Sequence, residues 1–197
     1  MWASKQMAQS KKSSGSLALK LGTFGLPILA VLIFVLFSLL LPDTYPTASN
    51  LQAILSNQSI PALLALGAMI PIVTAKFDLS MGYALGLSHV TVMYMLVNTK
   101  LSWPLVCLIA ILGSSVVGLI NGLLVEFAQI DSFIATLGTG SVLYALSGWI
   151  TGGGRIVPPP LGLPKGFTNT MDAHIFGLPI GAYYIIALVF ILVLILE

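Results

Sequence analysis

The sequence carries very little charge. Of its 197 residues only 7% are Asp, Glu, Lys or Arg, whereas 57% are hydrophobic. A soluble globular domain usually has about 25% charged residues. A chain of this length is long enough to bury a core, but its few charges do not suffice for a water-exposed surface. The composition therefore excludes a soluble domain and indicates that lipid surrounds most of the chain.

Groups that commonly carry chemistry are also scarce. Cys107 is the only cysteine, which excludes an internal disulfide. Neither His89 nor His174 has a carboxylate three or four residues further on, so a metal pair is not supported. There is no Walker motif and no Gly-x-Ser-x-Gly elbow. We therefore expect no catalytic residue, no metal and no cofactor; an intramembrane enzyme built on Asp78, His89 and Glu126 is the alternative.

The positive charges gather at the N-terminus. Four lysines lie within residues 1–20, namely Lys5, Lys11, Lys12 and Lys20. The net charge is only +2, so no nucleic-acid partner is implied. Because basic segments stay on the cytoplasmic side of membranes, residues 1–20 are predicted to be a cytoplasmic segment. A patch that binds anionic lipid is the alternative.

Long apolar runs dominate the remainder, and residues 21–197 are predicted to form one transmembrane domain. A run of about 20 residues crosses the hydrocarbon core as a helix. Six spans are expected, at residues 24–41, 60–75, 79–97, 105–125, 132–150 and 179–196. Residues 47–58 are amphipathic and either lie in the interface or extend the second span. Residues 151–170, rich in Gly and Pro, are expected to be a loop.

The predicted fold class is therefore all-α, a polytopic transmembrane helical protein with about six spans. Pro61 and Pro71 weaken the second span, and a broken helix is expected near residues 71–82. Asp78 stands in that break. One interpretation is a junction of two half-helices that faces a cavity; the other is an ordinary turn in which Asp78 caps the third span. With the N-terminus inside, five cations lie inside and three outside, which modestly favours that orientation.

Four short stretches resemble segments of one family. They are KFDLSMG at 76–82, VGLINGLLV at 117–125, IDSFIATLGT at 130–139 and TGG at 151–153. In order and spacing they are similar to motifs of the binding-protein-dependent ABC importer permeases of the ribose, galactose and xylose class. The positions that match the motifs are Asp78, Ser80, Gly82, Asn121, Gly122, Phe133, Thr136, Leu137 and Gly138.

The resemblance implies a function and partners. It implies a permease subunit in the bacterial inner membrane that moves a sugar or sugar-like solute by alternating access. The implied partners are cytoplasmic ATPase subunits, a periplasmic sugar-binding protein and a second permease subunit, identical or different. ATP hydrolysis would then belong to a partner, and this chain would not be an enzyme.

Three features depart from the family pattern. Lys76 stands where the family usually has glycine, and Asp131 where it often has proline. Family members are also longer, and their later half carries the segment that meets the ATPase. We therefore expect a C-terminally truncated permease, and the alternative function is a non-transporting scaffold or remnant.

A path for a neutral sugar should offer hydroxyl and amide groups rather than charge. The candidates for such a path are Asn121, Thr136, Thr139, Ser141 and Tyr144. The alternative for each is helix–helix packing or bonding to the backbone, because small and polar residues also hold membrane helices together. The sequence does not name the sugar.

Overall fold

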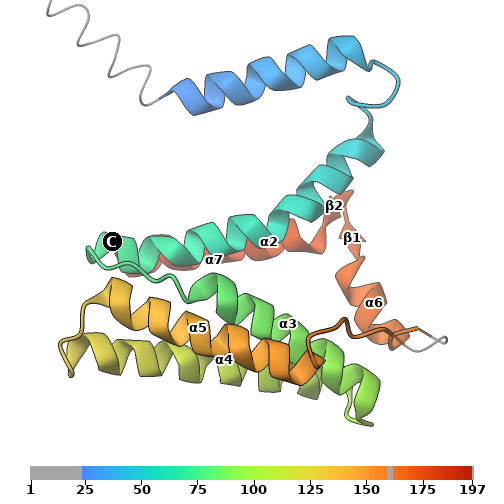
Figure 1. The fold of residues 1–197 in the computed structure, drawn as a ribbon. Helices are drawn as coiled ribbons and strands as arrows, with labels where there is room; N and C mark the ends of the chain where they lie inside the picture. Colours follow the sequence, from blue (N-terminus) through green and yellow to red (C-terminus); the bar gives the residue numbers. More distant parts are fainter. Residues whose placement is uncertain (1–23, 159–161, 197) are drawn as a thin grey trace, which may run out of the picture. The chain divides into compact units, whose positions relative to one another are not determined.

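The computed structural model describes residues 24–158 and 162–196 and shows a helical protein (Figure 1). The predicted segment 1–20 lies outside the described residues. Contacts divide the chain into two compact units, residues 1–53 and 54–197. The elements are a first helix Phe24–Leu40, α2 Ala48–Val73, α3 Met81–Asn98, α4 Trp103–Glu126, α5 Ser132–Thr151, α6 Lys165–Met171, β1 His174–Ile175, β2 Leu178–Pro179 and α7 Ile180–Leu196.

The first unit is an apolar helix followed by a turn. Phe24–Leu40 leaves nearly all of its large apolar side chains exposed, as a lipid-facing helix does. Beyond the helix the chain folds back, and Tyr45 lies against the rings of Phe34 and Phe37 at centroid distances of 5.6 and 5.3 Å. The helix agrees with the bounds predicted for the first span, residues 24–41, to within one residue, but it is among the shorter apolar helices.

Helix α2 includes both the amphipathic residues before the second span and most of the predicted span itself, residues 60–75. It runs unbroken from Ala48 to Val73 and contains both Pro61 and Pro71, so residues 47–58 extend the second span. It ends two residues before the predicted end. Ala75 there takes a left-handed backbone conformation with φ of 56°, which a non-glycine residue rarely adopts inside a helix. Residues 74–79 are non-helical, so the predicted break is present.

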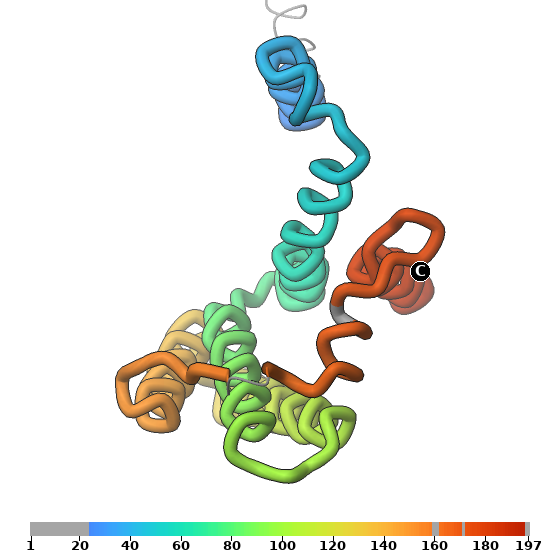
Figure 2. Tube along the Cα trace, turned by 90° about the vertical axis from the view of Figure 1, so that its right-hand side faces the viewer, coloured from blue at the N-terminus to red at the C-terminus, as the bar shows by residue number. Residues whose placement is uncertain are grey.

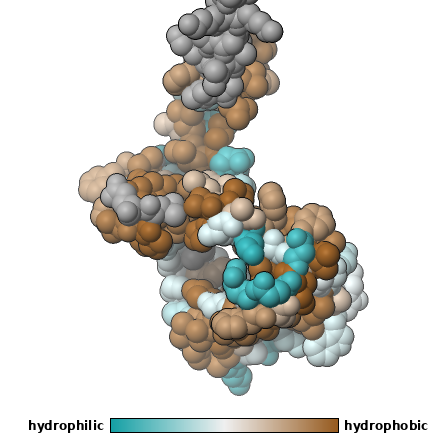
Figure 3. All heavy atoms as spheres, turned by 90° about the vertical axis from the view of Figure 1, so that its left-hand side faces the viewer, coloured by the Kyte–Doolittle hydropathy of each residue, from teal (hydrophilic) through white to brown (hydrophobic). Residues whose placement is uncertain are grey.

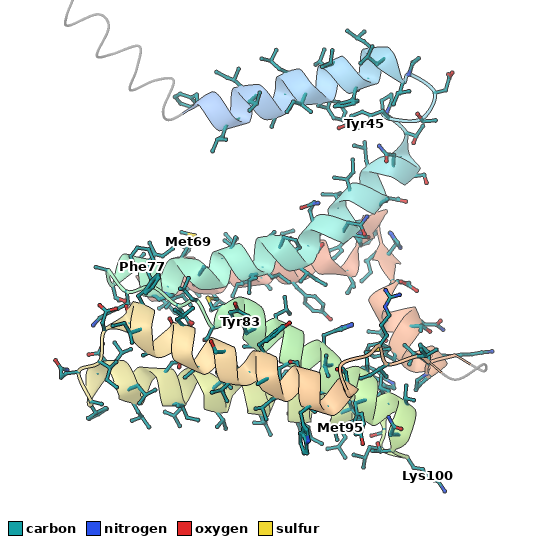
Figure 4. All side chains as sticks on the ribbon, in the orientation of Figure 1. Tyr45, Met69, Phe77, Tyr83, Met95 and Lys100 are labelled. Carbon is teal, nitrogen blue, oxygen red and sulfur yellow. The ribbon has the colours of Figure 1, made fainter. Side chains whose placement is uncertain are left out.

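Helices α3, α4 and α5 pack together, with α3 in contact with both others (Figures 1 and 2). Short connections, 99–102 and 127–131, join them. The buried side chains at the contacts are small or branched: Val106, Ala110, Val125, Ala135 and Leu143. Gly140 of α5 lies against the Tyr83 ring, which projects from the start of α3 (Figure 4). The larger apolar residues of these helices face outward, which suits lipid.

The helices confirm the predicted class of an all-α membrane protein. Among the described residues, α2, α4 and α5 are long and apolar enough to cross a membrane, and Phe24–Leu40 and the last helix are shorter apolar helices. The third predicted span forms as α3 but is not in either group. Ser88 and His89 lie in it, and two neighbouring helices partly cover it. A helix enclosed by protein tolerates polar residues that lipid does not.

Residues 151–170 contain more structure than the predicted loop. Helix α6 begins at Lys165 inside them, and Phe167 packs edge-on against Trp103 at 6.3 Å. A two-residue antiparallel hairpin, β1–β2, follows, and Phe176 and Gly177 form its turn with φ of 48° and 78°. Both elements are too short to show a hydrophobic period, so the sequence did not predict them.

Helix α7 agrees with the bounds predicted for the sixth span, residues 179–196, to within one residue, but it is among the shorter apolar helices. Near its start Gly181 lies against Ser59 of α2, so closely that a Cβ atom at Gly181 would overlap the serine side chain. Close approach of this kind at a small residue is typical of membrane helix pairs.

Candidate functional site

The non-helical segment between α2 and α3 is held by hydroxyl groups of α5. The Phe77 amide donates to Ser132 Oγ at 3.1 Å, and the Leu79 amide donates to Thr136 Oγ1 at 3.1 Å. Thr136 is 3% exposed, and its hydroxyl lies 2.7 Å from the Ser132 carbonyl oxygen. Unpaired backbone groups are costly among apolar helices. The two hydroxyls therefore supply the partners that the broken helix lacks.

A second chain of hydrogen bonds joins the same segment to α4. Ser80 donates its backbone amide and its hydroxyl to Asp78 Oδ1, at 2.8 and 2.6 Å. Asn121 Nδ2 donates to Ser80 Oγ at 2.7 Å. Ser80 and Asn121 are 2% and 5% exposed. We call Phe77 to Ser80 together with Asn121, Ser132 and Thr136 the polar junction.

One of the two interpretations of this segment made Asp78 the N-cap of α3, and the structure contradicts that role. Ser80 occupies the N-cap position of α3, and its side chain makes no capping hydrogen bond. Asp78 accepts from Ser80 instead of from the first turn of the helix. Of the two interpretations of this segment, the geometry favours a junction between helices beside a cavity.

That cavity measures about 170 Å³. Its lining comes from residues 71–78, from α4 and from the start of α5, and includes Asp78, Asn121, Gly122, Ser132 and Thr136. Hydrophilic residues gather around a hollow in the face shown in Figure 3. Among the described residues, no cluster of His, Cys, Asp or Glu is arranged to hold a metal.

Asn121 has unused capacity in this cavity wall. Its Oδ1 atom is buried and has no hydrogen-bond partner among the described residues. An unpaired buried acceptor costs about 1–3 kcal/mol, and most such atoms in folded proteins are paired. Asn121 Oδ1 is therefore an unpaired hydrogen-bond acceptor at the polar junction.

The two residues that depart from the family pattern both have partners. Lys76 Nζ lies 3.6 Å from Glu126 Oε1, and these side chains are 43% and 65% exposed, so the ion pair is weakly stabilising. Asp131 is the N-cap of α5 and accepts from the amides of Phe133 and Ile134, at 3.0 and 3.3 Å. Asp131 thus starts the helix in a way that proline, having no side-chain acceptor, does not.

The structure brings two of the five predicted path residues together. Asn121 and Thr136 meet at the polar junction. Thr139 and Ser141 bond to carbonyls of their own helix, those of Thr136 and Leu137. Tyr144 is 71% exposed and stands edge-on to Tyr83, with ring centroids 6.2 Å apart.

The other positions of the family motifs differ in whether they lie at the cavity. Gly122 lines the cavity, and a Cβ added at Gly82, Gly122 or Gly138 would meet nothing within 4 Å. Phe133 and Leu137 are exposed on α5. Sequence reasoning missed Ser132, whose hydroxyl holds the Phe77 amide. The available signal was its position as the first residue of α5, directly after the N-cap residue Asp131.

Ser114, Gly118 and Gly122 form a row of small residues on α4 at four-residue spacing, and this row is only partly covered. Ser114 meets Ser88 of α3, with their hydroxyl oxygens 2.6 Å apart. Gly118 and Gly122 have open space where a Cβ would be, and both border the cavity. The row therefore contributes to packing at one end and to the cavity wall at the other.

The comparisons with known proteins identify the class of protein. Residues 50–197 match the family described as "Branched-chain amino acid transport system / permease component", and the chain belongs to this family. It is 33% identical over 138 residues to the autoinducer 2 import system permease protein LsrC of Salmonella paratyphi B, covering 70% of this chain and 40% of that protein. No solved structure matches the chain.

A second relative covers more of the chain. The LsrC protein of Yersinia pestis (strain Pestoides F) is 35% identical over 160 residues, 80% of this chain and 44% of that protein. The chain thus spans less than half the length of these curated relatives. The predicted resemblance to importer permeases is confirmed, and the family is a membrane permease component, not an enzyme.

Proposed function

We propose that the chain is the permease subunit of an ABC importer that carries a sugar or sugar-like solute across the bacterial inner membrane. The polar junction carries this proposal. It places buried hydrogen-bonding groups from three segments around a cavity, among helices whose outer faces are apolar. Irregular backbone at membrane depth is tolerated where it is enclosed by protein or lines a cavity, as it does in transporters.

The chemistry of the junction suits a hydroxylated solute. Asn121, Ser132 and Thr136 line the cavity and carry an amide and two hydroxyls. A sugar hydroxyl both donates and accepts, so it can pair with each of these groups. The relatives are named as permeases of an autoinducer 2 import system, and the family model as a permease component of an amino acid transport system. Both names describe a permease of a transport system.

The orientation follows from the placement of charge. Lys76 and Glu126 stand at the end of the α3–α5 unit that carries the junction. With the N-terminal lysines inside, this end faces the cytoplasm, and residues 99–102 and 152–179 face the periplasm. The solute would arrive from a periplasmic binding protein and leave by way of the junction. Thr139, Ser141 and Tyr144 of α5 would line the route between the two faces.

The driving force would come from partners. The chain would pair with a second permease subunit and with cytoplasmic ATPase subunits, whose nucleotide cycle would switch the cavity between the two faces. ATP-bound partners would bind one of the two conformations, inward-open or outward-open, more tightly than the other. That difference in affinity would shift the equilibrium between them.

Co-purification tests the partner part of the proposal. The tagged chain is solubilised from its native membranes in mild detergent, and retained proteins are identified by mass spectrometry. We expect an ABC ATPase subunit to be retained, and retention to increase with a non-hydrolysable ATP analogue. A chain recovered with no ATPase under any nucleotide condition would instead support the non-transporting scaffold.

A further inference from the structure

A larger cavity lies away from the polar junction. It measures about 500 Å³, within the range of about 300–1,000 Å³ typical of small-molecule sites. Its polar lining groups are His89, Thr151 and Arg155, and its apolar ones include Val90, Met93 and Ile156. None of the residues of the polar junction lines it.

Two glycines build this cavity by reversing the chain after α5. Gly152 and Gly153 have φ of 61° and 76°, left-handed values that glycine adopts without strain. The Gly153 amide donates to the Gly148 carbonyl oxygen at 2.9 Å, which closes the helix end. The chain then runs beside α3 (Figures 1 and 2), so that Gly154–Pro158 and α3 form the walls.

The cavity has an uncompensated positive charge. Arg155 is the only arginine in the sequence. None of the described residues that line the cavity is acidic, and Arg155 forms no salt bridge among the described residues. A guanidinium stays charged and presents a planar set of donors that matches a carboxylate or phosphate. The lining therefore favours a ligand that carries an oxyanion.

The depth of the cavity favours a solute over a lipid headgroup. His89 lies near the middle of α3, Met81–Asn98, about 13 Å from the helix end nearer Arg155 at ~1.5 Å rise per residue. Lipid phosphates stay at the membrane surface, whereas this cavity reaches from a loop to the middle of a membrane helix. His89 and Thr151 then offer hydrogen bonds at two depths, which suits a molecule with hydroxyls beyond its anionic group.

From these observations we infer that the cavity is a solute site for a small polyhydroxylated acid, of the sugar-acid class. Arg155 pairs with the carboxylate, Thr151 and His89 bond to hydroxyls, and Val90 and Met93 cover the apolar face of the carbon skeleton. This inference rests on the proposed function in naming the solute class, but the binding site itself stands on the cavity alone.

Isothermal titration of the purified chain in neutral detergent tests the site. D-glucuronate and D-glucose are matched probes, because they differ chiefly in the carboxylate. We expect D-glucuronate to bind roughly 10- to 100-fold more tightly than D-glucose, the span of about 1.5–3 kcal/mol for a hydrogen bond to a charged group. Arg155→Gln should remove this difference, whereas Arg155→Lys should keep part of it.

Lys100→Gln is the control, because Lys100 carries a charge in the 99–102 connection and does not line the cavity. It should leave D-glucuronate binding unchanged, and circular dichroism should show the same helix content in every variant. Equal binding of both probes, no binding of either, or equal loss in the Lys100 and Arg155 variants would overturn the inference.

Lipid nanodiscs separate a solute from a headgroup. Phosphatidylcholine discs with and without phosphatidylglycerol are compared for D-glucuronate binding. Binding of similar strength in both supports the solute site, whereas displacement of the probe by phosphatidylglycerol would show that Arg155 holds lipid, and would overturn it. A chain that binds D-glucuronate but supports no uptake would disprove the importer function and leave the site intact.

Discussion

Asn121 of α4 donates a hydrogen bond to the hydroxyl of Ser80, 41 residues away in sequence, across 2.7 Å in the buried polar junction. The same hydroxyl donates to Asp78, so one serine connects the start of α3 to the C-terminal part of α4. This relationship holds the broken segment 74–80 against α4.

Ser80→Ala should destabilise the chain by about 1–3 kcal/mol, because it leaves the Asn121 amide buried without a partner. Thermal unfolding in detergent, followed by circular dichroism, measures the effect. Ser115→Ala is the matched control, since the exposed Ser115 hydroxyl bonds only to the Ile111 carbonyl of its own helix. A midpoint for Ser80→Ala as high as that of the control would show that the bond to Asn121 contributes nothing.

Thr136→Val should loosen the connection between α2 and α3. Valine keeps the shape of threonine but gives the Leu79 amide no acceptor. Hydrogen exchange measured by mass spectrometry should become at least several-fold faster in peptides that cover residues 77–80. Thr139→Val, whose hydroxyl bonds within α5, serves as the comparison. Equal exchange in the two variants would argue against the role of Thr136.

Gly140→Ala should strain the contact between α3 and α5. A Cβ at this position would lie 2.6 Å from Cδ2 of Tyr83, and overpacking of this kind typically costs about 1–3 kcal/mol. Tyr83→Ala in the same chain should restore part of the stability, because it removes the ring. Gly148→Ala has open space around the new methyl group and should be neutral or stabilising. Equal destabilisation by both alanines would contradict the proposed contact.

Asp131→Ala should weaken the start of α5 by about 0.5–2 kcal/mol, the usual cost of a lost N-cap. Asp131→Asn should retain most of the stability, because asparagine also accepts from the amides of Phe133 and Ile134. The denaturation midpoint of each variant distinguishes the two. If asparagine and alanine lower it equally, the charge of Asp131, and not its capping bond, stabilises this end.

The sequence predicted most helices well, because a long apolar run bounded by polar residues, Gly or Pro forms a helix. Residues 24–41, 105–125 and 132–150 lie within one or two residues of the observed bounds. Helix α6 and the hairpin were not predictable in this way. Their positions depend on contacts such as Phe167 with Trp103, which link residues far apart in the chain.

The site was only partly predictable for the same reason. The motifs identified Asp78, Ser80, Asn121 and Thr136 individually, but no local pattern indicates that Asn121 meets Ser80 or that Thr136 holds the Leu79 amide. These pairings come from how α3, α4 and α5 pack. The cavity lined by His89, Thr151 and Arg155 could not be predicted from the sequence either. It depends on the turn at Gly152, which brings Arg155 beside α3.

Uptake by living cells tests the central claim, that the chain is an importer subunit whose polar junction forms part of the solute path. Cells that lack the gene receive the wild-type chain, Asn121→Leu or Ser115→Ala, and take up labelled ribose, galactose, xylose or D-glucuronate. We predict that at least one solute loses uptake without the gene. Wild type and Ser115→Ala should restore it, and Asn121→Leu should not, at equal amounts in the membrane. Full restoration by Asn121→Leu, or unchanged uptake of every solute without the gene, would contradict the account.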